Sequence, residues 1–280
     1  EDDGGANITH YKILTQCSSN TLSDNIIGDW DFASHSGTAT VGEDISVNHG
    51  TFTEKGLVLS NEYATTSEFS FGVGAARTMT ACFTMASFSG KGGAVIGLQK
   101  TTSNQFDSLV WAERQDEIWM LGSNSFERTQ DIVGASKETV LGNEVCMTIT
   151  QSASGVVCGY RNGEAYGECY NDGVSTYPAD GWKVAFGPRI IGAQFTCVTT
   201  GCMDATIRRA QLYNRDLSAT EVLTLYQEIS SKIVLDVPMG WWGNSIVSAN
   251  INISKSGSSP CESKVVGCNS FGCSTDVATD

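Results

Sequence analysis

Ten cysteines carry the most evident chemistry of this 280-residue chain. A structural zinc site needs closely spaced cysteine or histidine ligands, but no two cysteines here are separated by only two residues, and there are only three histidines. An even number of cysteines without metal-ligand spacing is typical of disulfides formed in an oxidising compartment. The glycosylation sequons at Asn7 and Asn252 favour the same interpretation. We therefore expect a secreted or cell-surface, disulfide-bonded glycoprotein.

Cysteine spacing suggests two pairings. Cys197 and Cys202 bracket a short loop and are predicted to bond to each other. Cys146 and Cys158 are expected to face each other across a hairpin that joins residues 145–150 to residues 156–160. The rest of the connectivity does not follow from sequence.

The acidic balance of the chain excludes several classes of partner. There are 17 Lys and Arg residues against 31 Asp and Glu residues, which gives a formal net charge of -14. Nucleic acids and anionic membrane surfaces both require clustered cations, so neither is an expected partner. No run approaches the roughly 20 apolar residues of a membrane helix, so no membrane insertion is expected. If the chain is secreted, we expect a signal peptide to have been removed before Glu1.

Strand and turn signals predict an all-β sandwich. The chain has 30 glycines and many short runs of Val, Ile, Thr and Phe. Asn162-Gly163 predicts a type I′ hairpin turn, because both residues adopt positive φ readily. One helix is predicted over residues 218–229, where Ser218 is a helix N-cap and Glu221 completes a capping box.

Composition divides the chain into three parts. We predict an N-terminal arm over residues 1–19, a sandwich domain over residues 20–230 and a Cys/Ser/Gly-rich extension over residues 231–280. The extension is too polar to build a core of its own, so disulfides or another surface must hold it.

Several stretches of residues 26–227 occur in an order that is typical of one family. They are an opening strand at residues 26–32, a Trp-rich stretch at residues 106–129, a Tyr-Arg-Asn-Gly hairpin at residues 160–163, and a strand, turn and helix at residues 205–226. Together these motifs resemble the LamG-like jelly-roll family of the concanavalin A-like lectin/glucanase group. The resemblance implies an antiparallel jelly-roll β-sandwich with one short C-terminal helix. The composition of the extension adds an extended, disulfide-pinned tail after it. It also implies binding of glycans or proteins outside cells.

The resemblance bears on the two ends of the chain. Termini of this fold usually lie close together, so Cys17 is expected to join the tail. The tail cysteines are Cys261, Cys268 and Cys273. An intrachain staple is favoured over links between chains. Trp241 and Trp242 form a possible interface, because adjacent residues on an extended chain point to opposite sides and cannot both enter one core.

Enzymes of this fold carry an E-x-D-x-x-E pattern, which directs carboxylates into one cleft. That pattern is absent here, and we interpret Glu113 and Arg114 as a structural pair in a charged loop. No Ser/His/Asp motif occurs, so no catalytic residue is predicted.

Loops of this fold often bind calcium; the candidate ligands are Asp29, Asp31, Glu43 and Asp44. Solvated acidic loops are the favoured interpretation, and no other cofactor is expected.

These observations predict a non-catalytic, secreted LamG-like module that serves as a structural or adhesive subunit of an extracellular fibre, coat or matrix. Its expected partners are itself or other extracellular proteins, together with glycans. A monomeric, lectin-like carbohydrate-binding protein is the first alternative. A glycoside hydrolase or polysaccharide lyase with atypical catalytic acids is the second. Trp111, Trp119 and Trp182 are interpreted as core residues rather than glycan-stacking platforms.

Overall fold

The chain forms two compact units, Leu22–Tyr226 and a second unit of Glu1–Thr21 with Gln227–Asp280. The computed structural model describes backbone and side chains of residues 22, 24–70, 76–89, 91–101, 103, 105–173, 181–189 and 201–230. It also describes the backbone of residues 10–17, 235–238, 261–269 and 272–273.

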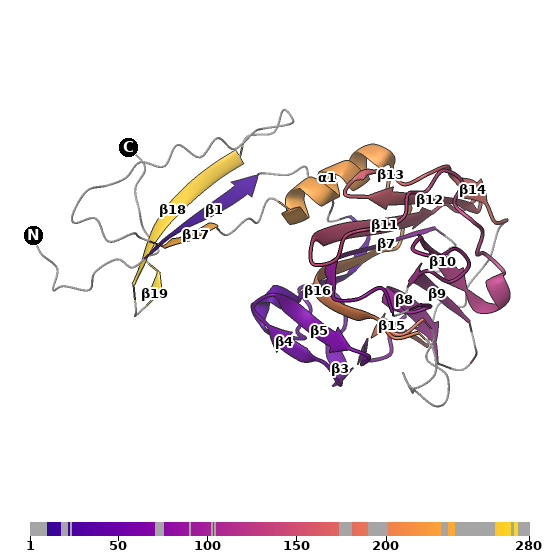
Figure 1. The fold of residues 1–280 in the computed structure, drawn as a ribbon, viewed down its shortest axis with the longest axis horizontal. Helices are drawn as coiled ribbons and strands as arrows, with labels where there is room; N and C mark the ends of the chain where they lie inside the picture. The colour runs from indigo at the N-terminus through magenta and orange to yellow at the C-terminus, as the bar shows by residue number, and fades with distance from the viewer. Residues whose placement is uncertain are drawn as a thin grey trace, which may run out of the picture. The chain divides into compact units, whose positions relative to one another are not determined.

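Two antiparallel sheets stack on each other in the unit Leu22–Tyr226 (Figure 1). Among the described residues, nine strands form one sheet in the order β13-β12-β11-β7-β16-β5-β4, with β14 beside β12 and β2 beside β16. These strands are β2 (Ile26–Asp31), β4 (Thr51–Thr53), β5 (Gly56–Ser60), β7 (Arg77–Met85), β11 (Glu144–Gln151), β12 (Val156–Arg161), β13 (Glu164–Ala165), β14 (Tyr170–Asn171) and β16 (Asp204–Tyr213).

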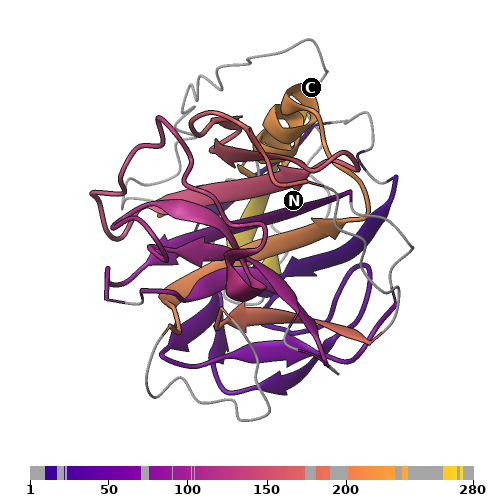
Figure 2. The same cartoon turned by 90° about the vertical axis from the view of Figure 1, so that its right-hand side faces the viewer.

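The second sheet has six described strands in the order β10-β9-β8-β15-β6-β3. They are β3 (Ile45–Asn48), β6 (Ala64–Thr66), β8 (Ala94–Lys100), β9 (Phe106–Trp111), β10 (Trp119–Ser123) and β15 (Trp182–Gly187). Short 3-10 turns follow two of the strands, η1 (Phe32–Ser34) after β2 and η2 (Asn124–Phe126) after β10. The strands of both sheets run in nearly the same direction when seen face on (Figure 2), which is the aligned packing typical of β-sandwiches.

Aromatic side chains fill the space between the sheets. Trp30 of β2 meets Phe186 of β15 edge to face, with ring centroids 5.5 Å apart, and Phe83 of β7 meets Trp119 of β10 at 4.8 Å. Burying a ring of roughly 200 Å² contributes about 5 kcal/mol, so these contacts hold the two layers together. Trp111, Trp119 and Trp182 are fully buried, which confirms their interpretation as core residues.

Both predicted hairpins are present. Strands β11 and β12 pair from Gln151↔Val157 to Met147↔Arg161, and β12 pairs with β13 at Arg161↔Glu164. Asn162 and Gly163 between them have φ of 53° and 81°. These are the positive values that a type I′ turn needs, so the Asn-Gly prediction is confirmed.

The predicted helix is α1 (Ala219–Ser230), and its capping box is formed. The Ser218 backbone N–H donates to Glu221 Oε2 at 2.8 Å, and the Glu221 N–H donates to Ser218 Oγ at 3.4 Å. Val222 and Leu225 are buried on the inner side of the helix. Within the described part of the chain, no helix is long and apolar enough to cross a membrane.

The predicted Cys146–Cys158 disulfide is wrong. Cys146 of β11 bonds to Cys82 of β7, its direct partner in the strand register, and Cys158 bonds to Cys169. The hairpin register explains the error, because Cys158 lies opposite Thr150, four positions from Cys146. Cys202 is disulfide-bonded, but its predicted partner Cys197 lies outside the described residues.

The arm and the extension, predicted as separate segments, pair into one four-stranded sheet in the order β17-β1-β18-β19. Its strands are β1 (His10–Cys17), β17 (Leu235–Pro238), β18 (Cys261–Asn269) and β19 (Gly272–Cys273). The tail is therefore partly regular strand rather than extended chain held by disulfides alone. Backbone register places Cys17 opposite Cys261 and Cys268 opposite Cys273. The register agrees with the expectation that Cys17 joins the tail, and the disulfide itself stays a prediction.

Candidate functional site

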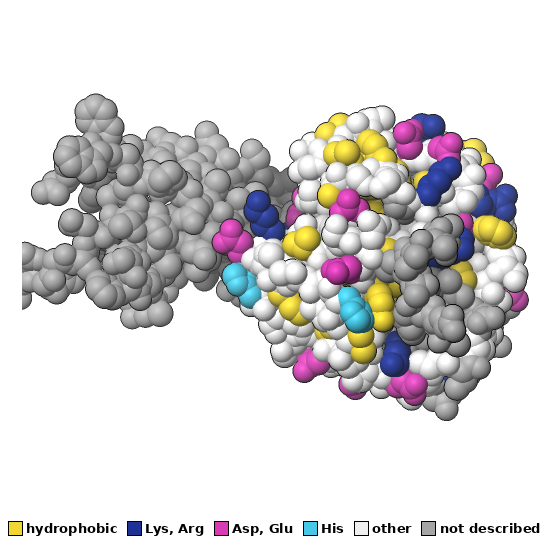
Figure 3. Space-filling view, turned by 60° about the horizontal axis from the view of Figure 1, so that its bottom comes forward, with side chains coloured by type: hydrophobic (Ala, Val, Ile, Leu, Met, Phe, Trp, Pro, Cys, Tyr) yellow, Lys and Arg dark blue, Asp and Glu magenta, His cyan; other side chains and the backbone are white. Residues whose placement is uncertain are grey.

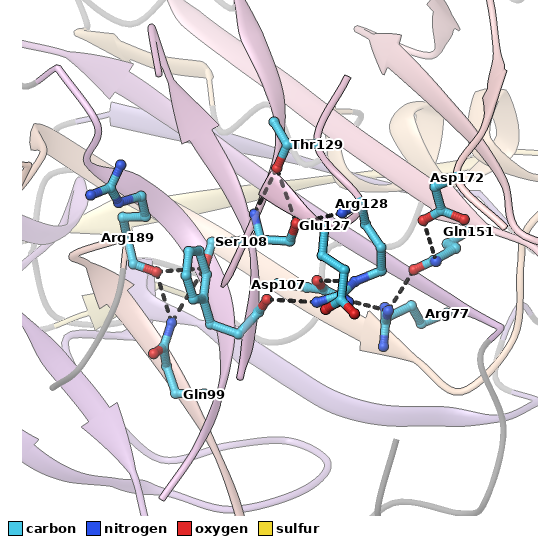
Figure 4. Close-up of polar contacts among 12 residues, drawn as sticks. Arg77, Gln99, Asp107, Ser108, Glu127, Arg128, Thr129, Gln151, Asp172 and Arg189 are labelled. Carbon is cyan, nitrogen blue, oxygen red and sulfur yellow. Dashed lines mark hydrogen bonds and ion pairs between the residues drawn. The ribbon is translucent and has the colours of Figure 1, made fainter. Parts of the chain in front are cut away.

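A buried aspartate ties the two sheets of the sandwich together. Asp107 lies on β9, and its side chain points into the core, as do those of Leu109 and Trp111 two and four residues further on. Arg77, at the start of β7 in the opposite sheet, forms an ion pair with Asp107. Arg128 donates from Nε to Asp107 Oδ1 at 2.8 Å. Figure 4 shows Asp107 between the two guanidinium groups.

The network continues from Arg77 to the edge of the other sheet. Arg77 donates from Nη2 to Gln151 Oε1, and Gln151 Nε2 donates to Asp172 Oδ2 at 2.8 Å (Figure 4). Burial raises the pKa of Asp172 to about 6, and the negative charge of Asp107 acts in the same direction. The arginines oppose this rise but do not cancel it.

Arg128 also clamps the loop that follows the edge strand β10, which we call the edge loop (residues 123–131). The Arg128 backbone N–H donates to Ser123 Oγ at 2.8 Å, and its carbonyl accepts from the Tyr170 hydroxyl at 3.0 Å. Ser123 in turn donates its backbone N–H to Thr129 Oγ1 at 2.8 Å. The Arg128 side chain is only 2% exposed, so the loop is fixed from inside the sandwich.

The clamped loop holds a strained turn. Ser125 and Phe126 have φ of 54° and 57°, a left-handed conformation that costs non-glycine residues roughly 1–3 kcal/mol each. Such strain persists only where the surrounding structure enforces it, and the Arg128 clamp lies directly after the turn. Phe126 remains 49% exposed.

Phe126 has a polar neighbour pair at the surface. The Arg114 guanidinium lies over the Phe126 ring in a cation–π contact, with its central carbon 5.8 Å from the ring centroid. Arg114 also donates from Nε to Asp131 Oδ1 at 2.9 Å, and both side chains are about half exposed. We call these three residues the edge patch. Arg114 covers one face of the half-exposed ring, and the remaining face, together with the guanidinium and the carboxylate, offers an apolar surface, donors and acceptors for binding.

The predicted Glu113–Arg114 pair is wrong, because Arg114 binds Asp131 and Glu113 binds Arg189. Arg189 Nη1 donates to Glu113 Oε1 at 2.5 Å, whereas Glu113 Oε2 is buried with no hydrogen-bond partner among the described residues. Burial raises the pKa of Glu113 although Arg189 opposes it. Gly122 permits this arrangement, since a Cβ there would lie 2.7 Å from Glu113 Oε2.

The four candidate calcium ligands do not converge. Arg209 donates to both carboxylate oxygens of Asp29, at 2.8 and 3.2 Å, and lies 3.7 Å from Asp31. Asp44 accepts the Ala39 backbone N–H at 2.8 Å, and Glu43 takes part through its backbone carbonyl, which accepts from Trp30. The described residues contain no group of three or more His, Cys, Asp or Glu side chains that could hold a metal ion.

Four other predicted site residues lie outside the residues that the structure describes. They are Asn7, Asn252, Trp241 and Trp242. On the face drawn in Figure 3, acidic and basic side chains are scattered singly rather than gathered into a patch of one sign. The sequence alone assigned no function to the edge patch. One signal was available: Asp107 lies within an apolar strand, and a buried aspartate requires a buried cation such as Arg128, which in turn fixes the edge loop.

No family model and no curated protein matches the chain. Among solved structures, domain 4 of AbnA, an extracellular GH43 arabinanase from Geobacillus stearothermophilus in complex with arabinotriose, is 14% identical with a TM-score of 0.55. That match covers 72% of this chain and 98% of the domain. Trypanosoma rangeli sialidase is 13% identical with a TM-score of 0.52, over 77% of this chain but only 36% of the sialidase.

At such identities the similarity concerns the fold alone. What the two structures share with this chain is a β-sandwich fold. The predicted all-β sandwich with one short helix is therefore confirmed. The narrower LamG-like resemblance stays a prediction.

Proposed function

We propose that this chain is a non-catalytic, extracellular glycan-binding module whose binding surface is the edge loop. The observation that carries the proposal is the clamp: Arg128 fixes the loop from inside the sandwich, and the loop presents the half-exposed Phe126. A surface ordered before binding spends little free energy on ordering when it binds. Such a rigid loop on a sandwich scaffold is a favourable place for recognition.

The fold neighbours support a sugar as ligand, because the AbnA domain of similar fold was solved with arabinotriose. The disulfides Cys82–Cys146 and Cys158–Cys169 support an extracellular location, since such bonds persist in oxidising compartments.

The state of the buried carboxylates supports a non-catalytic role. A glycosidase needs two carboxyl groups that face a sugar across an open site. The buried acids Asp29, Asp107 and Glu138 are each held in an ion pair with an arginine. Glu113, whose side chain is also buried, is paired with Arg189. Breaking such a pair to free an acid for catalysis would leave an uncompensated charge in the protein.

The full disulfide-bonded chain is tested on a glycan array and on immobilised neutral and acidic polysaccharides, with calcium and with EDTA. We expect retention on at least one class of glycan and no release of reducing sugar. EDTA is expected to change neither glycan retention nor melting temperature, because Asp29, a candidate calcium ligand, is already bound by Arg209 in an ion pair. A blank result on every glycan would overturn the proposal, and sugar release would replace it with an enzymatic function.

Assembly into an extracellular fibre or coat is the second candidate. Strand β18 pairs with β1 from Cys261 to Cys268, but on its other side it pairs with β19 only at Cys268 and Asn269. No described strand covers that side between Cys261 and Gly267. An open strand edge is a template for pairing with another chain. Light scattering without reductant tests this: oligomers that dissociate when Val265, within this stretch, is changed to Pro favour assembly, and a monomer argues against it.

A further inference from the structure

We infer that Phe126 is the stacking platform for a neutral pyranose ring, with Arg114 and Asp131 contacting the hydroxyl groups at the ring's edge. The inference rests on the proposed function and names its ligand class. The first observation is the position of Phe126, whose ring is half exposed on the edge loop. The backbone of this loop is held in a left-handed turn and is fixed by the hydrogen bonds of Arg128. The fold therefore holds an apolar ring in water instead of burying it.

The chemistry of the edge patch matches a sugar in both its apolar and its polar parts. A pyranose has C–H groups on one face, which pack on an aromatic ring, and hydroxyl groups around its rim, which need donors and acceptors. Phe126 supplies the ring face that Arg114 does not cover. Arg114, whose guanidinium carbon lies 5.8 Å from the ring centroid, supplies donors, and Asp131 supplies acceptor oxygens. The Arg114–Asp131 ion pair orients both groups before a ligand arrives.

Charge decides between a neutral and an acidic sugar. The charged side chains of the two segments that carry the edge patch, residues 113–117 and 127–131, are all paired with opposite charges: Glu113 with Arg189, Arg114 with Asp131, Asp116 with Lys91, Glu117 with Lys137, and Glu127 with Arg128. Within these two segments no cation is therefore in excess to hold a carboxylate or sulfate group. In a chain with a net charge of -14, an anionic glycan would also be repelled at long range.

The variant Phe126→Gly tests the platform without adding strain. Glycine adopts the left-handed φ of this position at no steric cost, so the loop keeps its shape while the ring is lost. Val133→Ala is the matched control, because Val133 is also an exposed apolar residue, at 63% exposure, and lies outside the edge patch. Phe126→Trp keeps a ring and enlarges its face. Circular dichroism melts verify that each variant is folded.

The probe is the neutral oligosaccharide that corresponds to the best-retained polysaccharide, titrated by isothermal calorimetry into each protein. We expect Phe126→Gly to lose about tenfold or more in affinity, Phe126→Trp to retain it, and Val133→Ala to change it by less than about twofold. Arg114→Met is expected to weaken binding to a smaller extent, because only hydroxyl contacts are lost.

The outcomes separate this inference from the proposed function. Glycan binding that Phe126→Gly leaves unchanged would overturn the stacking platform while the glycan-binding function stands. Binding of acidic glycans alone would overturn the neutral ligand class. If the wild-type protein retains no glycan, both the glycan-binding function and the stacking platform are wrong. A loss of binding to a protein partner in Phe126→Gly would then identify Phe126 as a contact residue for that protein.

Discussion

Asp107 and Asp29 are both buried aspartates held by arginine, but they connect different levels of the structure. Asp29 on β2 pairs with Arg209 on the adjacent strand β16, so the ion pair stays within one sheet. Asp107 receives Arg77 from the opposite sheet and Arg128 from the edge loop. The first pair ties neighbouring strands that backbone hydrogen bonds already join. The second joins two layers and a loop that have no backbone ladder between them.

The difference shows where a buried charge matters most for architecture. Arg209 is 15% exposed, so water screens its interaction with Asp29 and can solvate it when Asp29 is lost. Arg77 and Arg128 are at most 3% exposed, and Asp107 is the buried carboxylate that they share. Arg128 also contacts Glu127, which is 61% exposed. We therefore expect the two sites to respond unequally to the same substitution.

The largest effect is expected for Asp107→Asn. The substitution preserves shape but removes the carboxylate that Arg77 and Arg128 share, so that Arg128 keeps the more exposed Glu127 as an ion-pair partner. Breaking a buried pair in this way costs about 3–5 kcal/mol. Urea unfolding monitored by tryptophan fluorescence measures the loss. Hydrogen exchange of residues 124–131 should rise in the same variant, because the anchor of Arg128 is removed. A loss no greater than that of Asp29→Asn would contradict the comparison.

A smaller loss, about 1–2 kcal/mol, is expected for Asp29→Asn. Arg209 keeps Asp31 at 3.7 Å and keeps partial access to water. The same urea experiment serves, and exchange in residues 124–131 should be unchanged. If exchange in that loop rises as it does for Asp107→Asn, the Asp29 and Asp107 sites are coupled and do not act independently.

The smallest effect should come from Asp172→Asn, and it should depend on pH. The folded-state pKa of Asp172 is about 6 against an ordinary value of 3.8, so the folded protein binds the extra proton between these values. The unfolding free energy of wild type therefore falls as pH rises through that window. The variant, which cannot ionise, should be more stable at pH 8 by at most about 1 kcal/mol, because solvent screens this partly exposed group.

Thermal melts between pH 3.5 and pH 8 follow this difference. The advantage of the variant should shrink as pH falls and vanish below the ordinary aspartate pKa. A variant that is less stable than wild type at pH 8 would mean that the ionised carboxylate stabilises Gln151 and the arginines more than its burial costs.

Local chemistry made part of the fold predictable. Asn162-Gly163 and the Ser218–Glu221 capping box are decided by residues within a few positions, and both are formed as expected. The disulfide of Cys146 was not predictable in the same way. Its partner Cys82 lies 64 residues earlier, and only the pairing of β7 with β11 brings the two together.

The candidate site shows the same limit. Asp107, Arg128 and Phe126 all lie in the stretch that carries the family resemblance, but sequence could not show that Arg128 turns inward while Phe126 turns outward. Arg128 turns inward to reach Asp107, 21 residues earlier, and the register of the strands, not the local sequence, brings the two together. The second partner of Asp107, Arg77, comes from the opposite sheet. The pairing of β1 with β18 spans almost the whole chain and was likewise beyond local reasoning.

The register of β1 and β18 has a mechanical consequence. His10 lies opposite Cys268 and Cys17 lies opposite Cys261, so the first residue of one strand adjoins the end of the other. A pulling force applied at residues 10 and 268 acts across the ladder and loads its hydrogen bonds one at a time. The two strands would therefore separate at low force, starting from the end at which the force is applied.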